Sequence, residues 1–140
     1  MPQWLRGDPH GWAALLRELA SRPMPHLAHW DIRVDNLLRR TDGSVVFVDW
    51  GMAARGPAWV DPLLARLERV EDAWFDTSLG TSPALGAMGD DVVTAFLAGF
   101  GAQLAVRSVG AVDVNLPTIN DFRITESRRM LGAVARRPGR

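Results

Sequence analysis

Residues 29–50 read HWDIRVDNLLRRTDGSVVFVDW, and this stretch decides how the rest of the chain is interpreted. Two short runs in it, 36–40 and 44–49, are strand-like, and the second consists mainly of the valine and phenylalanine that strands favour. The Thr-Asp-Gly triplet at 41–43 between them is typical of a tight turn. The sequence therefore predicts a β-hairpin, which brings the asparagine that opens the first run close to the aspartate that ends the second.

Helical patterns surround the predicted hairpin. Asp8 followed by Pro9 is typical of a helix start, and apolar residues follow at helical spacing until Pro23 ends the pattern. We expect further helices over 59–70, 90–107 and 118–137, and irregular segments or loops over 26–34, 51–57, 77–89 and 109–116. The predicted fold class is α+β, mostly α, as a single domain over residues 1–140 with one short β-hairpin.

The composition excludes several classes of function. The chain has 47% hydrophobic and 23% charged residues, which is typical of a globular domain rather than a disordered one. Its formal net charge is zero, which argues against a nucleic-acid or membrane-surface partner. There is no cysteine, no signal-peptide pattern and no apolar run long enough for a membrane span, so we expect a cytoplasmic protein. All sixteen basic residues are arginine, so the sequence contains no lysine.

The chemistry-bearing residues form the pattern H-x-D-x-x-x-x-N, followed by the hairpin and a second aspartate. This arrangement suits phosphoryl transfer, which needs a positioned nucleophile, metal ions and neutralised phosphate charge. Asp31 is the candidate catalytic base, and Asn36 and Asp49 offer the hard oxygen ligands that magnesium requires. Arg33 is a second catalytic candidate, because a guanidinium there would face charge developing on the phosphoryl group. For His29 we expect a structural role, in which its ring nitrogens brace the loop.

These motifs resemble the aminoglycoside phosphotransferase (APH) family, a branch of the protein-kinase-like superfamily. The family pattern combines His-Gly-Asp-x-x-x-x-Asn, a hairpin, a hydrophobic-Asp-Trp motif and a Gly-Pro segment with a later aspartate. The matching residues here are His29, Asp31, Asn36, Leu37, Leu38, Val48, Asp49, Trp50, Gly56, Pro57 and Asp61.

The resemblance implies a protein-kinase-like C-terminal lobe that carries its catalytic and metal loops on a hairpin. Asp31 would then be the catalytic base, and Asn36 and Asp49 would bind the cofactors magnesium and ATP. The implied reaction is the ATP-dependent phosphorylation of a hydroxyl on a small molecule, possibly an aminoglycoside. For Asp61, the residue pattern by itself favours a helix cap or a buried hydrogen-bond acceptor.

Two departures from the family pattern bear on activity. Trp30 replaces the usual small residue between the histidine and the aspartate. The phosphate-covering glycine loop and the ATP-clamping lysine of the family's N-terminal lobe have no counterpart in these 140 residues. We therefore expect this chain to be inactive alone, and either to pair with a nucleotide-binding lobe supplied elsewhere or to self-associate through the face left uncovered.

Two alternatives stay open from the sequence. One is a non-catalytic remnant or binding module that keeps the kinase-like fold. The other is a lobe of a neighbouring kinase-like family, such as the choline, homoserine or fructosamine kinases. The motif does not separate these relatives, because the acceptor pocket lies in the variable helices.

Overall fold

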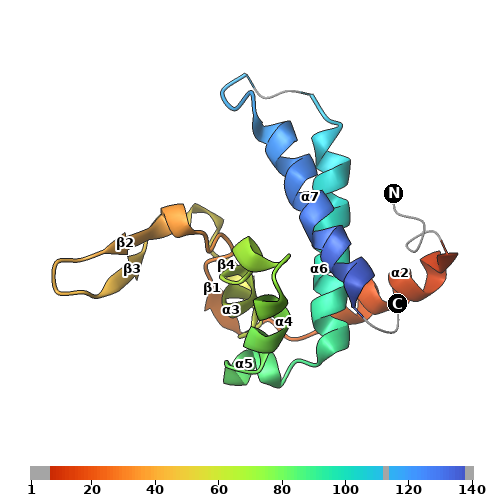
Figure 1. Cartoon of the computed structure of the whole chain (residues 1–140), viewed down its shortest axis with the longest axis horizontal. Coiled ribbons are helices and arrows are strands. Elements are labelled where there is room, and N and C mark those ends of the chain that lie inside the picture. The colour runs from red at the N-terminus through yellow and green to blue at the C-terminus, as the bar shows by residue number, and fades with distance from the viewer. Residues whose placement is uncertain (1–6, 112–113, 138–140) are drawn as a thin grey trace. The chain divides into compact units, whose positions relative to one another are not determined.

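The computed structural model describes residues 7–111 and 114–137, which form two compact units (Figure 1). The first unit combines Met1–Ser21 with Gly89–Arg140, and the second is Arg22–Met88. Every residue of the predicted hairpin and catalytic loop belongs to the second unit. The expectation of one domain over 1–140 stays a prediction, and each unit is described here by itself.

The first unit is helical. It contains α2 (Pro9–Ser21), α6 (Asp90–Ser108) and α7 (Ile119–Arg136), and α6 and α7 lie side by side (Figure 1). The three predicted helices are confirmed to within a residue or two. Asp8 accepts a hydrogen bond from the Gly11 amide at 2.8 Å, as expected of a residue that caps the start of α2.

Small residues allow the helices of this unit to pack closely. A Cβ built on Gly101 of α6 would lie 3.1 Å from the Leu131 side chain of α7. A Cβ on Gly99 would lie only 2.7 Å from the Leu16 side chain of α2. The two glycines weaken helix propensity, but they let α6 contact both neighbouring helices at short range.

In the second unit, the predicted hairpin is confirmed. Strand β2 (Leu37–Arg39) pairs antiparallel with β3 (Val45–Phe47), with Leu37 opposite Phe47. The turn between the strands is stabilised by Asp42, whose Oδ1 accepts hydrogen bonds from the amide and hydroxyl of Ser44 at 2.9 and 2.7 Å. Gly43 adopts a φ of 85°, which a glycine reaches without the steric cost of a Cβ.

A second small sheet lies in two segments that the sequence predicted to be irregular. Strand β1 (His26–Ala28) pairs antiparallel with β4 (Ala54–Gly56), so this part of the prediction was wrong. Each strand is only three residues long and has little β-propensity, so the pairing depends on tertiary contacts rather than on local sequence. Gly56 is required at the pairing, because a Cβ there would lie 2.8 Å from the Cβ of Ala28.

The predicted helix over 59–70 and loop over 77–89 are also corrected. The first is divided into α3 (Val60–Leu64) and a 3₁₀ turn η3 (Leu67–Arg69), while α4 (Ala73–Leu79) and α5 (Pro83–Gly86) occupy much of the second region. The apolar pattern did identify the core, since Leu63, Leu64 and Leu67 are buried. Short helical turns bury them, so tertiary packing overrides the periodicity that suggested one continuous helix.

The described residues therefore form an α+β arrangement in which helices predominate, as predicted. None of the described helices combines the length and the apolar character needed to cross a membrane.

Candidate active site

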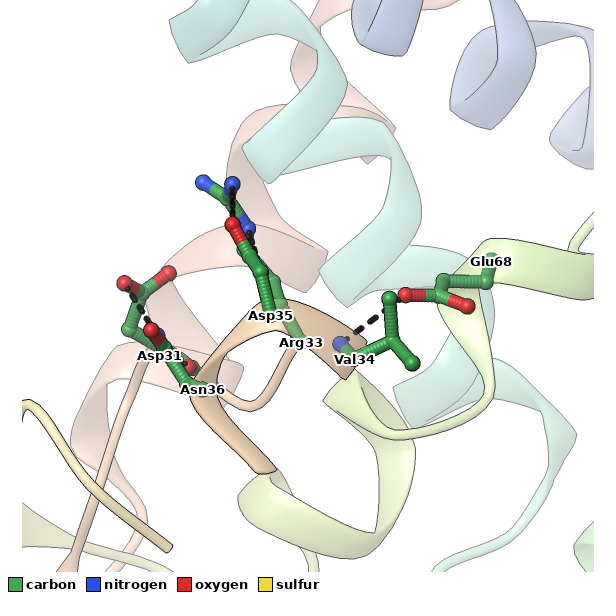
Figure 2. Close-up of polar contacts among 6 residues, drawn as sticks. All are labelled: Asp31, Arg33, Val34, Asp35, Asn36 and Glu68. Atoms are coloured by element: carbon green, nitrogen blue, oxygen red, sulfur yellow. Dashed lines mark hydrogen bonds and ion pairs between the residues drawn. The ribbon is translucent and has the colours of Figure 1, made fainter. Parts of the chain in front are cut away.

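The candidate base Asp31 lies in the loop after β1 and is hydrogen-bonded to Asn36 of the 3₁₀ turn η1 (Val34–Asn36) (Figure 2). The Asn36 amide nitrogen donates to the Asp31 carbonyl at 2.8 Å and to its carboxylate Oδ2 at 3.0 Å. Oδ1, the other carboxylate oxygen of Asp31, accepts no hydrogen bond from any residue that the structure describes. Asp31 is thus held on one side and keeps one oxygen with which to accept a proton.

His29 braces this loop from inside, as the sequence predicted. Its side chain is 1% exposed, and its Nε2 lies 2.8 Å from the carbonyl oxygen of Val48. The Asp31 amide donates to Nδ1 at 3.3 Å. Nδ1 must then be the unprotonated nitrogen, so Nε2 carries the proton and donates to Val48. One neutral imidazole therefore connects the Asp31 backbone to the end of β3.

Asp61, in the first turn of α3, anchors the same loop from a distant point of the sequence. Its two carboxylate oxygens accept hydrogen bonds from the amides of His29, at 2.7 Å, and Trp30, at 3.0 Å. The sequence predicted a cap or a buried acceptor. The acceptor role is confirmed, although Asp61 is half-buried and its partners lie in the catalytic loop rather than in its own helix. Hydrogen bonds to an ionised group are among the stronger ones in proteins.

The two candidate metal ligands lie at neighbouring positions of the hairpin. The Val48 amide donates to the Asn36 carbonyl at 3.0 Å, which extends the β2–β3 ladder by one pair and places Asp49 next to that pair. Asp49 adopts a left-handed conformation with a φ of 58°, and its exposed carboxylate accepts from the Gly51 amide at 3.4 Å.

This donor set fits magnesium. Because the Asn36 amide nitrogen is directed at Asp31, its carbonyl oxygen remains, and no described residue donates to it. Asp49 keeps one carboxylate oxygen that has no hydrogen-bond partner within the described part of the chain. One charged and one neutral oxygen donor are the hard ligands that magnesium prefers. Among the described residues, at this site and elsewhere, there is no cluster of three or more His, Cys, Asp or Glu able to hold a metal ion.

Arg33 forms an exposed ion pair with Asp35, in which its Nε lies 3.0 Å from Asp35 Oδ1 (Figure 2). The hydrogen bond to Asp35 raises the pKa of Arg33, and the charges of Asp35, Asp31 and Glu68 raise it further. The same hydrogen bond lowers the pKa of Asp35. The sequence suggested a phosphate contact for Arg33 and did not predict this pairing. Both partners are exposed, so water replaces the contact and separating them costs little.

Glu68 of η3 is a residue of the site that the sequence gave no reason to select. Its Oε1 accepts from the Val34 amide at 3.1 Å, at the start of the turn that carries Asn36 (Figure 2). The contact joins segments 34 residues apart, so no local motif could reveal it. Glu68 therefore helps to fix the turn from which Asn36 reaches Asp31.

The comparison with protein families agrees with this geometry. A sequence model of APH, described as the phosphotransferase enzyme family, matches residues 4–100, which include the catalytic loop, the hairpin and Asp61. Neither the curated proteins nor the solved structures gave a match to the chain. Since the family match covers more than half of the 140 residues, the chain belongs to the phosphotransferase enzyme family.

Proposed function

We propose that the chain provides the catalytic lobe of a kinase-like phosphotransferase that transfers a phosphoryl group from ATP to a hydroxyl on a small molecule. Family membership supports kinase-like phosphoryl transfer at a coarse level. The observation that carries the finer proposal is the placement of Asp31, which is fixed through Oδ2 while Oδ1 accepts nothing among the described residues. A base held this way is poised to orient a hydroxyl and take its proton.

Asn36 and Asp49 would hold magnesium through the amide oxygen of the first and the free carboxylate oxygen of the second. When bound, the metal neutralises charge on the phosphate oxygens. Asn36 would also keep Asp31 in place, because its amide nitrogen is bonded to that carboxylate. Arg33 would contact the transferred phosphoryl group after leaving Asp35, and the low cost of breaking an exposed pair supports this step.

The acceptor belongs to the class of small hydroxylated molecules, with an aminoglycoside as one member, and we place the reaction in the cytoplasm. These 140 residues contain no lysine, so a lysine that clamps the charge on ATP would have to come from outside them. We therefore expect the purified chain to bind magnesium-ATP weakly and to turn it over very slowly.

The proposal is tested by calorimetric titration of ATP into the 140-residue chain with and without magnesium. We expect ATP binding to strengthen with magnesium, and this gain to disappear in Asp49→Asn. Asp121→Asn is the matched control, since it neutralises an exposed carboxylate on α7 in the other unit. An ATP affinity that does not depend on magnesium would argue against the site. So would an increase in ATP affinity with magnesium that is still present in Asp49→Asn.

A transfer assay with labelled ATP and a panel of small alcohols tests the role of the base. Any phosphorylated product should be lost in Asp31→Asn and retained in Asp121→Asn. Product formation that persists without the Asp31 carboxylate would remove Asp31 from the mechanism.

A further inference from the structure

Trp30 has a backbone conformation that its side chain disfavours. Its φ is 64°, in the left-handed region where a bulky residue with a Cβ is rare. A small residue, as the family pattern has between histidine and aspartate, would reach this conformation at lower cost. Such a conformation persists only where the surrounding contacts hold it, and it often lies at a functional site.

One backbone hydrogen bond and one side-chain hydrogen bond hold Trp30 in place. The Trp30 amide donates to Asp61 Oδ1 at 3.0 Å, and the indole Nε1 donates to the carbonyl oxygen of Arg55 in β4 at 3.2 Å. The indole also approaches Gly56 closely, since a Cβ built there would lie 3.2 Å from Nε1. The neighbouring strand thus supplies both a hydrogen-bond acceptor and the space for the ring.

We propose that Trp30 is a positioning residue, which ties the catalytic loop to β4 through its indole and thereby fixes the direction of the Asp31 carboxylate. The inference rests on the proposed function for the role of Asp31. Trp30 and Asp31 share a peptide bond, so a rotation of Trp30 out of its left-handed conformation redirects the Asp31 side chain. His29 and Asp61 hold the backbone of the loop, and the indole adds a third attachment on a strand that neither of them contacts through its side chain.

The attachment of the Trp30 indole to β4, called the tether below, explains how a bulky residue is accommodated at this position. A glycine there would be free of steric cost in the left-handed region, but it would also be free to leave it. The tryptophan instead restricts the loop to one conformation. The hydrogen bond from the indole to Arg55 and the close approach of the ring to Gly56 select this conformation. A loop with this attachment is expected to keep Asp31 aimed even before a substrate is bound.

The experiment is amide hydrogen exchange, followed residue by residue by NMR, on the 140-residue chain. Trp30→Phe keeps a ring but removes the donor, and Trp30→Gly removes both the ring and the steric cost. Trp74→Phe is the matched control, because Trp74 is an exposed tryptophan of the same unit whose ring lies against the Arg69 guanidinium.

We expect Trp30→Phe to speed exchange at the backbone amides of residue 30 and Asp31 about tenfold, the effect of losing one hydrogen bond. Trp30→Gly should speed it at least as much, while amides of α3 and α4 stay within about twofold of the parent chain. A purely structural role in the β1–β4 sheet would instead accelerate exchange across the whole unit. Unchanged loop amides, uniform acceleration, or an equal effect of Trp74→Phe would each overturn the proposal.

This readout does not require catalysis, so it separates the tether from the function. If the loop loosens as expected but ATP binding is insensitive to Asp49→Asn, the positioning contact stands and the proposed reaction fails. If magnesium-ATP binding behaves as expected but the loop amides do not respond to Trp30→Phe, the reaction stands and the tether fails.

Discussion

Replacing Asp61 by asparagine should loosen the catalytic loop without unfolding the chain. The carboxylate accepts two backbone amides, from His29 at 2.7 Å and from Trp30 at 3.0 Å. Asparagine offers one oxygen and turns an NH₂ group toward the second amide, where donor faces donor. One charge-assisted hydrogen bond is lost, a second is weakened to a neutral one, and a part-buried N–H is left without its acceptor.

The magnitude follows from these losses. A hydrogen bond to a charged group contributes about 1.5–3 kcal/mol, and an unsatisfied buried donor costs about 1–3 kcal/mol. Asp61 is half-buried, so water recovers part of this, and we expect Asp61→Asn to lower the free energy of unfolding by about 2–3 kcal/mol. A domain of ordinary stability, about 5–15 kcal/mol, survives such a loss. Asp61→Ala, which leaves both amides unsatisfied, should cost more.

Urea unfolding followed by tryptophan fluorescence measures the loss, because Trp30 lies in the loop and the Trp50 ring contacts His29. Asp121→Asn, in the other unit, is the control. The reasoning is refuted if Asp61→Asn changes the free energy of unfolding by less than about 0.5 kcal/mol, the usual effect of a surface substitution. It is also refuted if Asp61→Ala is the milder of the two changes.

Three further predictions concern the metal, the second sheet and the surface. Asp49→Asn should weaken magnesium binding in the presence of ATP more than Asn36→Ala, since only the first removes a full charge; equal effects in a magnesium titration would contradict this. Gly56→Ala should lower the free energy of unfolding by about 1–3 kcal/mol, because its Cβ meets Ala28 at 2.8 Å, whereas Gly86→Ala, with open space around it, should not. The exposed apolar side chains of the β2–β3 hairpin predict self-association, which sedimentation over a range of concentrations checks; a monomer throughout would contradict it.

The parts of the fold that the sequence predicted are those specified locally. The hairpin follows from a turn in which Asp42 bonds Ser44 and Gly43 takes a positive φ, all within three residues. The long helices α6 and α7 extend over many turns, so helix-compatible residues within each segment suffice to predict them. Neither needs information from a distant segment.

The parts that the sequence missed depend on distant contacts. Strands β1 and β4 are three residues each, and their paired residues His26 and Gly56 are 30 positions apart in the sequence, so neither strand is recognisable alone. The same holds for the candidate site: the motif selected Asp31, Asn36 and Asp49 as candidates, but not the acceptor that Glu68 offers to the Val34 amide. Motif spacing predicts which side chains do chemistry, whereas the contacts that aim them come from the tertiary fold.

In the proposed site, Asn36 would join the base and the metal ligands into a single unit rather than two neighbouring ones. Its amide nitrogen is bonded to the Asp31 carboxylate, which fixes the amide plane and leaves its oxygen as the candidate metal ligand. Together with Asp49 this would supply only two of the six ligands in the octahedral shell of magnesium, so water and nucleotide phosphates would have to complete it. Metal and nucleotide should therefore bind together. Since Asn36→Ala removes a ligand and frees Asp31 at once, its effect on phosphoryl transfer should exceed its effect on magnesium binding, while Asp49→Asn should affect both alike.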